Sequence, residues 1–359
     1  MALKAFLFFF FALFFCNIII TNQTVMPNFT SILIFGDSTM DTGNNNYILT
    51  LVKANHLPYG KDYPNNVPTG RFSNGKLVPD MLAFLLNLKQ NGVPPYLQPN
   101  LSTNELCTGI NFASAGSGYD DLTSTITSTI PISKQLEYFE EYLEKIKGVV
   151  GKTEAEKIVK GGLVIISCGT NDFVFNFYDI PTRRLQFSTI SKYQDFLLEK
   201  LQSFVKELYD LGCRMIVLNG LPPIGCLPIQ MTAKSPLLRT CIENENFDAQ
   251  LYNQKLKKLL PQLQAQLPGS TILYANTYNP LLDLINNPQQ YGFEKTKRGC
   301  CGSGLLEAGP LCTSLSPVCS NTSQYVFFDS VHPTEATYYK LTEYLVKDFL
   351  SQLSSIRSP

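Results

Sequence analysis

The sequence predicts an α/β fold, a single three-layer α/β/α domain around a mainly parallel sheet of about five strands. Short apolar, β-branched runs recur along the chain, and longer stretches with helical periodicity separate them. The runs at 163–167 and 214–219 are apolar without alternation, as expected for strands that helices cover on both faces. No internal repeat or linker divides the chain after its first 25 residues, so we expect one domain, 26–359.

The expected elements alternate between strand and helix. The strands are expected at residues 31–35, 108–113, 163–167, 214–219 and 271–276. The helices are expected near residues 75–88, 132–147, 190–211 and 242–266. A last helix should begin after Pro333, because proline suits the first helical turn. Folds of this kind bind ligands beyond the carboxyl ends of their strands, so the residues that follow each strand are the candidates for function.

Residues 1–25 have the composition of a secretory signal peptide that is cleaved. Lys4 precedes an apolar run at 5–16, which 18–20 extends. A membrane anchor is the alternative, but Asn17 interrupts the run, which ends before the roughly 20 residues that a spanning helix needs. No later segment is apolar enough to span a bilayer. We therefore expect a secreted protein of the extracellular space or the cell wall.

The composition excludes several classes of function. The 29 basic residues balance the 29 acidic ones, so the cationic surface of a nucleic-acid-binding protein is not expected. Only His56 and His332 are available, which argues against a zinc site built on several histidines. The chain has no nucleotide-binding glycine motif and no G-x-S-x-G nucleophile elbow. No metal and no organic cofactor are implied.

Sequons provide a second indication of secretion. Four N-x-Ser/Thr sequences occur, and on a secreted chain their asparagines are expected glycosylation sites: Asn22, Asn28, Asn100 and Asn321. Asn28 precedes the first strand, whereas Ser38 follows it. A glycan on Asn28 is therefore expected at the edge of the sheet opposite the strand ends.

The cysteines fit an oxidising compartment. Removing Cys16 with the leader leaves an odd number, so at least one thiol is unpaired if all pairing is internal. Four cysteines lie in one Gly/Ser/Pro-rich stretch: Cys300, Cys301, Cys312 and Cys319. A structural zinc site is the alternative there, but no CxxC pair is present and secretion favours disulfides. Their connectivity stays open, and Cys226 with Cys241 is a plausible local pair. Cys168 and Cys213 are expected to be buried.

Residues with reactive or hydrogen-bonding groups follow the predicted strands. The first strand is followed by Gly36-Asp37-Ser38, the second by Gly116 and the third by Asn171, and Asp329 and His332 lie near the C-terminus. Each alone is ordinary turn or helix-cap chemistry. Together they supply a hydroxyl, accessible backbone N–H groups, an amide, a carboxylate and an imidazole, which are the parts for acyl transfer by a serine nucleophile.

The residues that follow the strands form four groups along the chain: Gly36-Asp37-Ser38, Gly116, Asn171, and Asp329 with His332. In this order they resemble the four sequence blocks of the GDSL or SGNH hydrolases, and their context resembles the plant GDSL esterase/lipase branch. Further stretches similar to that branch are 41–44, 69–75, 221–226 and 298–302. The resemblance covers about residues 31–350 and implies a flavodoxin-like SGNH hydrolase fold. One departure is Thr39, where the family motif has leucine. It follows the nucleophile and supplies no required catalytic atom, so little consequence is expected.

The resemblance implies a role for each residue. Ser38 is the expected nucleophile, His332 the base, and Asp329 the group that fixes the imidazole tautomer. The expected oxyanion hole consists of the backbone N–H groups of Ser38 and Gly116 and the amide of Asn171. The implied activity is that of a secreted serine esterase or lipase, which hydrolyses acyl or lipid esters through an acyl-enzyme.

Other interpretations stay open at this point. An acyltransferase or a deacetylase of cell-wall polysaccharide would use the same site, and a secreted binding glycoprotein without activity is a third alternative. We expect Asp37 to support the turn, His56 to be a loop residue, and disulfides in 300–319 to hold the loop of Asp329 and His332. The expected partner is a small-molecule or lipid ester and no nucleic acid, and the sequence does not indicate an oligomeric state.

Overall fold

A computed structural model describes residues 27–180 and 182–357 of the chain. The expected leader, 1–25, and the sequon at Asn22 lie outside the described residues. The described part is built on a five-stranded sheet in the order β2-β1-β3-β4-β5, with every neighbouring pair parallel. The strands are β1 (Ile32–Gly36), β2 (Gly109–Asn111), β3 (Leu163–Ser167), β4 (Met215–Asn219) and β5 (Thr271–Ala275). The predicted parallel sheet is confirmed.

Strand β2 is shorter than the predicted 108–113, and the side chain of Asn111 is hydrogen-bonded to backbone groups where the strand ends. Its Oδ1 accepts a hydrogen bond from the Ala113 N–H at 2.8 Å, and its Nδ2 donates to the carbonyl of Met40 at 2.6 Å. The paired register with β1 ends at Asn111, although the N–H groups of Phe112 and Ser114 still donate to the carbonyls of Ile34 and Gly36 at 2.8 and 3.0 Å. The following residues form the loop that carries Gly116.

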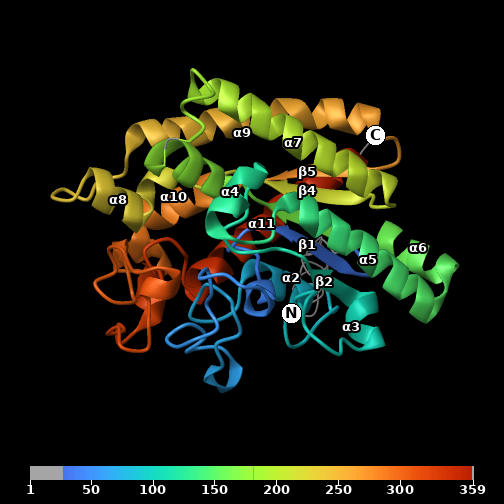
Figure 1. The fold of residues 1–359 in the computed structure, drawn as a ribbon, viewed down its shortest axis with the longest axis horizontal. Coiled ribbons are helices and arrows are strands. Elements are labelled where there is room, and N and C mark those ends of the chain that lie inside the picture. Colours follow the sequence, from blue (N-terminus) through green and yellow to red (C-terminus); the bar gives the residue numbers. More distant parts are fainter. Residues whose placement is uncertain (1–26, 181, 358–359) are drawn as a thin grey trace, which may run out of the picture.

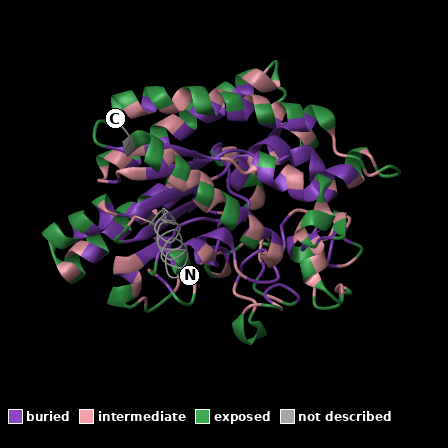
Figure 2. Cartoon of the chain, turned by 180° about the vertical axis from the view of Figure 1, so that it is seen from behind, coloured by how far each residue is buried: buried purple, intermediate pink, exposed green. Residues whose placement is uncertain are grey.

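Helices cover both faces of the sheet (Figure 1). One face carries α5 (Ile132–Val150), α7 (Ile190–Asp210) and α9 (Glu243–Gln266). The other carries α2 (Val78–Leu85) and α11 (Glu335–Arg357). The five predicted helices are these, with ends shifted by a few residues. Figure 2 shows the resulting layers, with buried strands at the centre and exposed outer faces of the helices.

Shorter elements were not expected from the sequence. The helices among them are α3 (Thr103–Thr108), α4 (Asp121–Thr127), α6 (Lys152–Lys160), α8 (Pro228–Lys234) and α10 (Tyr278–Asn286). A π-helical segment, Asp172–Asp179, follows β3. Strands β6 (Lys295–Gly299) and β7 (Tyr325–Phe327) form a second, two-stranded sheet. The sequence of β6 is Lys-Thr-Lys-Arg-Gly, which has no apolar pattern to mark it as a strand.

Three disulfides cross-link the chain, which confirms the prediction of disulfides for the cysteine-rich stretch. The pairs are Cys226–Cys241, Cys300–Cys319 and Cys301–Cys312, and the free thiols of the described residues are those of Cys107, Cys168 and Cys213. Cys168 and Cys213 are buried, as predicted. Two of the disulfides belong to a small second core together with Tyr59, Phe72 and Phe328.

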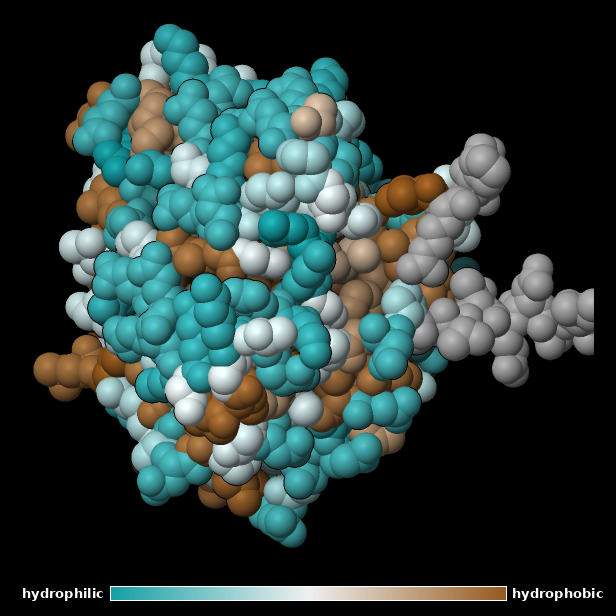
Figure 3. Space-filling view, turned by 90° about the vertical axis from the view of Figure 1, so that its right-hand side faces the viewer, coloured by the Kyte–Doolittle hydropathy of each residue, from teal (hydrophilic) through white to brown (hydrophobic). Residues whose placement is uncertain are grey.

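The surface is mixed in character. On the side shown in Figure 3, hydrophilic side chains dominate and apolar ones are gathered in small groups between them. Within residues 27–180 and 182–357, no helix is both long and apolar enough to cross a membrane.

Candidate active site

Ser38 lies in the turn that ends the first strand, β1, which is the neighbour of the central strand β3. Gly36 closes β1 with a φ of +134°, and a Cβ there would lie 1.9 Å from the carbonyl oxygen of Ser167 on β3. Only glycine allows this close approach of the two strands. The next residue, Asp37, accepts hydrogen bonds from the N–H and the hydroxyl of Thr39 at 3.0 and 2.8 Å. Asp37 thus supports the turn, and Thr39 takes part in that support.

His332 reaches Ser38 from the other end of the chain, in the loop between β7 and α11. Its Nε2 lies 2.8 Å from the Oγ of Ser38, and its Nδ1 lies 2.7 Å from Oδ2 of Asp329. A carboxylate can only accept hydrogen bonds, so Nδ1 carries the proton and Nε2 accepts from the serine hydroxyl. The three side chains form one continuous chain of hydrogen bonds.

Asp329 is fully buried, and within the described residues every hydrogen-bond partner of its carboxylate is a donor. Oδ1 accepts from the backbone N–H groups of Val331 and His332 at 2.8 and 2.7 Å. Oδ2 accepts from His332 and also from the hydroxyl of Tyr59, at 2.7 Å each. These contacts hold the carboxylate in one orientation, and through it the imidazole ring.

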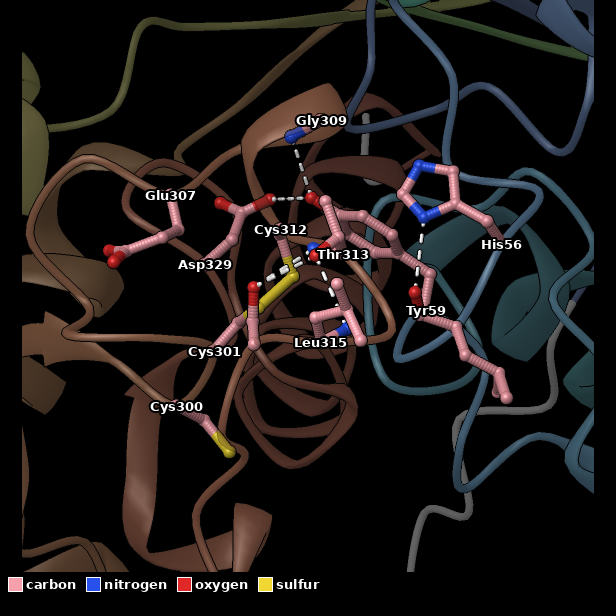
Figure 4. The surroundings of a disulfide bond; sticks show 12 residues. His56, Tyr59, Cys300, Cys301, Glu307, Gly309, Cys312, Thr313, Leu315 and Asp329 are labelled. Atoms are coloured by element: carbon pink, nitrogen blue, oxygen red, sulfur yellow. Dashed lines mark hydrogen bonds between the residues drawn. A yellow bond between two sulfur atoms is a disulfide. The ribbon is translucent and has the colours of Figure 1, made fainter.

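Tyr59 and Phe72 belong to the site, although sequence reasoning assigned neither residue a role there. The Tyr59 hydroxyl accepts a hydrogen bond from the Gly309 N–H at 2.7 Å while it donates to Asp329 (Figure 4). Burial, together with the charge of Asp329, raises the pKa of Tyr59 well above its usual value, so it remains a donor. The ring of Phe72 lies 4.8 Å from that of His332, measured between centroids. No motif links Tyr59 to a partner so distant in the sequence.

The loops of Ser38 and Gly116 are joined through Asp41. Its Oδ1 accepts from the N–H groups of Gly43 and Asn44 at 2.7 Å each, and its Oδ2 accepts from the Ala115 N–H at 3.0 Å. Gly116 follows with a φ of +88°. Within the described residues, the backbone N–H groups of Ser38 and Gly116 donate to no protein acceptor. Both are therefore free to bind a ligand oxygen.

Asn171 follows β3 and joins the same group of loops. Its Nδ2 donates to the carbonyl of Ser117, next to Gly116, at 2.9 Å. Asn171 and Ser38 line one pocket of about 800 Å³, which includes the space open to solvent. Gly116 does not line that pocket, and lies on the adjoining loop. The structure thus gathers all five predicted site residues at the carboxyl edge of the sheet.

Buried carboxyl groups surround the site. Burial raises the pKa of Asp37 and that of Asp41 to about 6 each. Burial also raises the pKa of Asp172, the neighbour of Asn171, to about 8, against the hydrogen bonds that it accepts from Thr123 and from the N–H of Tyr119. These carboxyl groups hold the loops around the site in place, because they accept hydrogen bonds from backbone N–H groups and hydroxyls of those loops.

The remaining predicted residues lie apart from Ser38. The ring nitrogens of His56 lie 3.1 Å and 3.2 Å from the carbonyl oxygens of Leu57 and Lys53, so His56 packs within its own loop. The sequon asparagines among the described residues are all exposed: Asn28, Asn100 and Asn321.

Comparison with known proteins identifies the family. A family model described as GDSL-like lipase/acylhydrolase matches residues 32–345. The chain belongs to this family. The GDSL esterase/lipase At2g24560 of Arabidopsis thaliana is 57% identical over 327 residues, which are 90% of each chain. The GDSL esterase/lipase At2g30310 of the same plant is 56% identical over 325 residues, again 90% of each chain. The predicted resemblance is confirmed, and this GDSL protein is a carboxylic ester hydrolase.

Proposed function

We propose that this GDSL hydrolase is a secreted serine esterase that cleaves acyl or lipid esters through an acyl-enzyme on Ser38. The observation that carries the proposal is the continuous chain of hydrogen bonds from Ser38 through His332 to Asp329. A serine hydroxyl is a weak nucleophile unless a base accepts its proton, and Nε2 of His332 is positioned to do so.

In the first half-reaction, Oγ of Ser38 attacks the carbonyl carbon of the ester while its proton passes to Nε2 of His332. The carbonyl π electrons move to the oxygen, and the resulting oxyanion accepts hydrogen bonds from the N–H groups of Ser38 and Gly116 and from Asn171. Collapse of this intermediate breaks the ester C–O bond. The leaving alkoxide takes the proton from Nε2 and departs as the alcohol.

In the second half-reaction, water attacks the acyl carbon and gives its proton to Nε2 of His332. The second tetrahedral intermediate collapses, the bond to Ser38 breaks, and its Oγ recovers the proton as the carboxylic acid leaves. Asp329 stabilises the imidazolium that exists during both steps. Loss of one oxyanion donor typically slows turnover by about 10²–10³-fold.

Three features support the secretory part of the proposal. The leader-like composition of residues 1–25 is the first. The second is the set of three disulfides, which persist in oxidising compartments. The third is the exposure of the sequon asparagines. The test is expression in a eukaryotic secretory host and recovery of the protein from the culture medium. N-terminal sequencing of that protein tests cleavage of the leader, and glycosidase treatment tests glycosylation.

The catalytic roles are tested with matched substitutions of serine and histidine. Ser38→Ala and His332→Ala should each lower kcat for a p-nitrophenyl ester by about 10⁴-fold or more, because the residues act as one unit. His56→Ala is the control, since the chain has only these two histidines. Labelling of the wild type by a fluorophosphonate, together with loss of that labelling in Ser38→Ala, would identify Ser38 as the residue that carries the acyl group. A folded wild type that is not labelled contradicts the proposed role of Ser38.

A further inference from the structure

Two apolar cavities lie end to end between α11 and the sheet. The outer cavity is the pocket that begins at Ser38 and Asn171, and the inner one extends away from them. Val78, Asn219 and Leu345 line both cavities, so the two meet at these residues. We call the pair the α11 channel. Ser38 and Asn171 lie at its outer end, and the mechanism above makes no use of the rest of it.

One wall of the α11 channel is a single stripe of helix α11. Five lining residues recur at helical spacing, three or four apart, from the end near Ser38 to the far end: Tyr338, Leu341, Leu345, Phe349 and Gln352. Val346 and Asp348, beside this stripe, also line the inner cavity. At 1.5 Å per helical residue, this stripe is about 21 Å long. The far end is marked by Asp348 and Gln352, which are only partly buried.

The opposite wall is the face of the sheet toward α11. Alternate residues of a strand share one face, and the inner cavity is lined by such residues of three neighbouring strands. They are Leu163 and Ile165 of β3, Val217 of β4, and Leu273 and Ala275 of β5. Apart from Asn219 at the junction and Tyr274, whose carbonyl accepts a hydrogen bond from Gln352 at 2.8 Å, the sheet side of the inner cavity is therefore apolar. It suits a hydrocarbon ligand and offers nothing to a charged one.

A polar group at the outer end indicates that a ligand oxygen enters there. Tyr338 lines the outer cavity, and its hydroxyl is buried and has no hydrogen-bond partner within the described residues. A buried hydroxyl without a partner is costly, so an oxygen atom of a bound molecule would satisfy it. The ligand is thus expected to carry oxygen near Ser38 and to be apolar beyond it.

Given the acyl-enzyme on Ser38 proposed above, we propose that the α11 channel binds the hydrocarbon chain of a long-chain acyl ester. The acyl carbon is bonded to Oγ of Ser38, a residue that lines the outer cavity, and the chain continues between α11 and the sheet. One leaflet of a bilayer core, the extent of one lipid acyl chain, is about 15 Å thick. The length of the α11 stripe accommodates such a chain.

The wild-type enzyme tests the proposal without any substitution. With p-nitrophenyl esters of 2 to 16 carbons, kcat/KM should rise at least about tenfold between 4 and 12 carbons, because each buried methylene favours binding. p-Nitrophenyl alkylphosphonates, whose alkyl group takes the place of the acyl chain, should inactivate the enzyme correspondingly faster when the alkyl chain is long. Rates that do not depend on chain length, or that fall with it, overturn the proposal.

Ala275→Leu tests the position of the chain, since Ala275 lines only the inner cavity. The added side chain should lower the ratio of kcat/KM for the 12-carbon ester to that for the 4-carbon ester at least about tenfold. The control is Ala249→Leu in α9, which is equally a buried alanine but lines neither cavity, and which should leave the ratio unchanged. A ratio that is unchanged in folded Ala275→Leu contradicts the proposed path.

The outcomes separate this proposal from the proposed function. If no ester is hydrolysed and no phosphonate labels Ser38, the proposed function is wrong. If short and long phosphonates label Ser38 at equal rates, the nucleophile is correct and the α11 channel does not bind the chain. Should Ala275→Leu fail to fold, the comparison of phosphonates on the wild type decides by itself.

Discussion

At the residue scale, the partners of Asp329 differ in where they come from. The N–H groups on Oδ1 belong to its own loop, whereas the Tyr59 hydroxyl on Oδ2 comes from a segment 270 residues away in sequence. The first contacts follow from the spacing of Asp329 and His332, which a single turn can accommodate. The tyrosine is a tertiary contact, and no local pattern could have predicted it.

Tyr59 is expected to orient Asp329. Tyr59→Phe removes the donor to Oδ2 and leaves the Gly309 N–H without its acceptor. The free energy of unfolding should fall by about 1.5–3 kcal/mol, since a hydrogen bond to a charged group is lost. Because the imidazole is then held less firmly, kcat should also fall while KM stays constant.

Steady-state kinetics and urea denaturation measure both effects. Tyr63→Phe is the control, because its hydroxyl donates only to a backbone carbonyl outside the site, that of Asn91. If Tyr59→Phe lowers stability and leaves kcat unchanged, the tyrosine has only a structural role.

At the scale of elements, the main sheet and the long helices followed from apolar runs and helical periodicity. The second sheet did not, because β6 is mostly charged and is held by its neighbours. The backbone N–H groups of Cys300 and Cys301 donate to the carbonyls of Phe327 and Phe328, at 3.1 and 2.8 Å. The cysteine-rich stretch thus pairs directly with the chain that leads into Asp329, and tertiary pairing there outweighs local propensity.

The disulfide Cys301–Cys312 is expected to support the loop of Asp329 and His332. Replacing both cysteines by serine should lower the free energy of unfolding by about 2–3 kcal/mol, as for a cross-link that closes a short loop. It should also lower kcat, because the carbonyl of His332 accepts the Phe328 N–H at 2.7 Å in the same segment. Cys107→Ser, at a free and half-buried thiol, is the control. Equal kcat in the double variant and the wild type would argue against this support.

At the scale of the whole molecule, balanced charge hides an uneven distribution of carboxyl groups. Most acidic side chains are on the surface, but Asp37, Asp41 and Asp172 are buried beneath the site. The sequence could place Asp37 and Asp41 beside Ser38 as turn residues. It could not show their burial, because burial depends on how three separate loops close over one another.

Those three carboxyl groups predict the pH dependence of stability. The pKa values of Asp37, Asp41 and Asp172 are raised to about 6, 6 and 8, above those of the same groups in the unfolded chain. Between the unfolded and the folded pKa of each group, the folded protein therefore binds more protons than the unfolded chain. Their contribution to stability is therefore complete below about pH 4 and is lost as the pH rises through 6 and then 8. Urea denaturation at pH 5, 6.5 and 8 should give a decreasing free energy of unfolding. An increase over this range would contradict the assignment.

The hydrogen bond between Ser38 and His332 joins residues 294 positions apart, which has a consequence for biosynthesis. Translation proceeds from the N-terminus at about 5–20 residues per second, so the serine leaves the ribosome well before the histidine. Under the proposed mechanism, a nascent chain on the ribosome has a nucleophile and no base. Hydrolysis can begin only once the segment leading into the last helix has been made. Until then, the nascent chain is inactive in the cell that synthesises it.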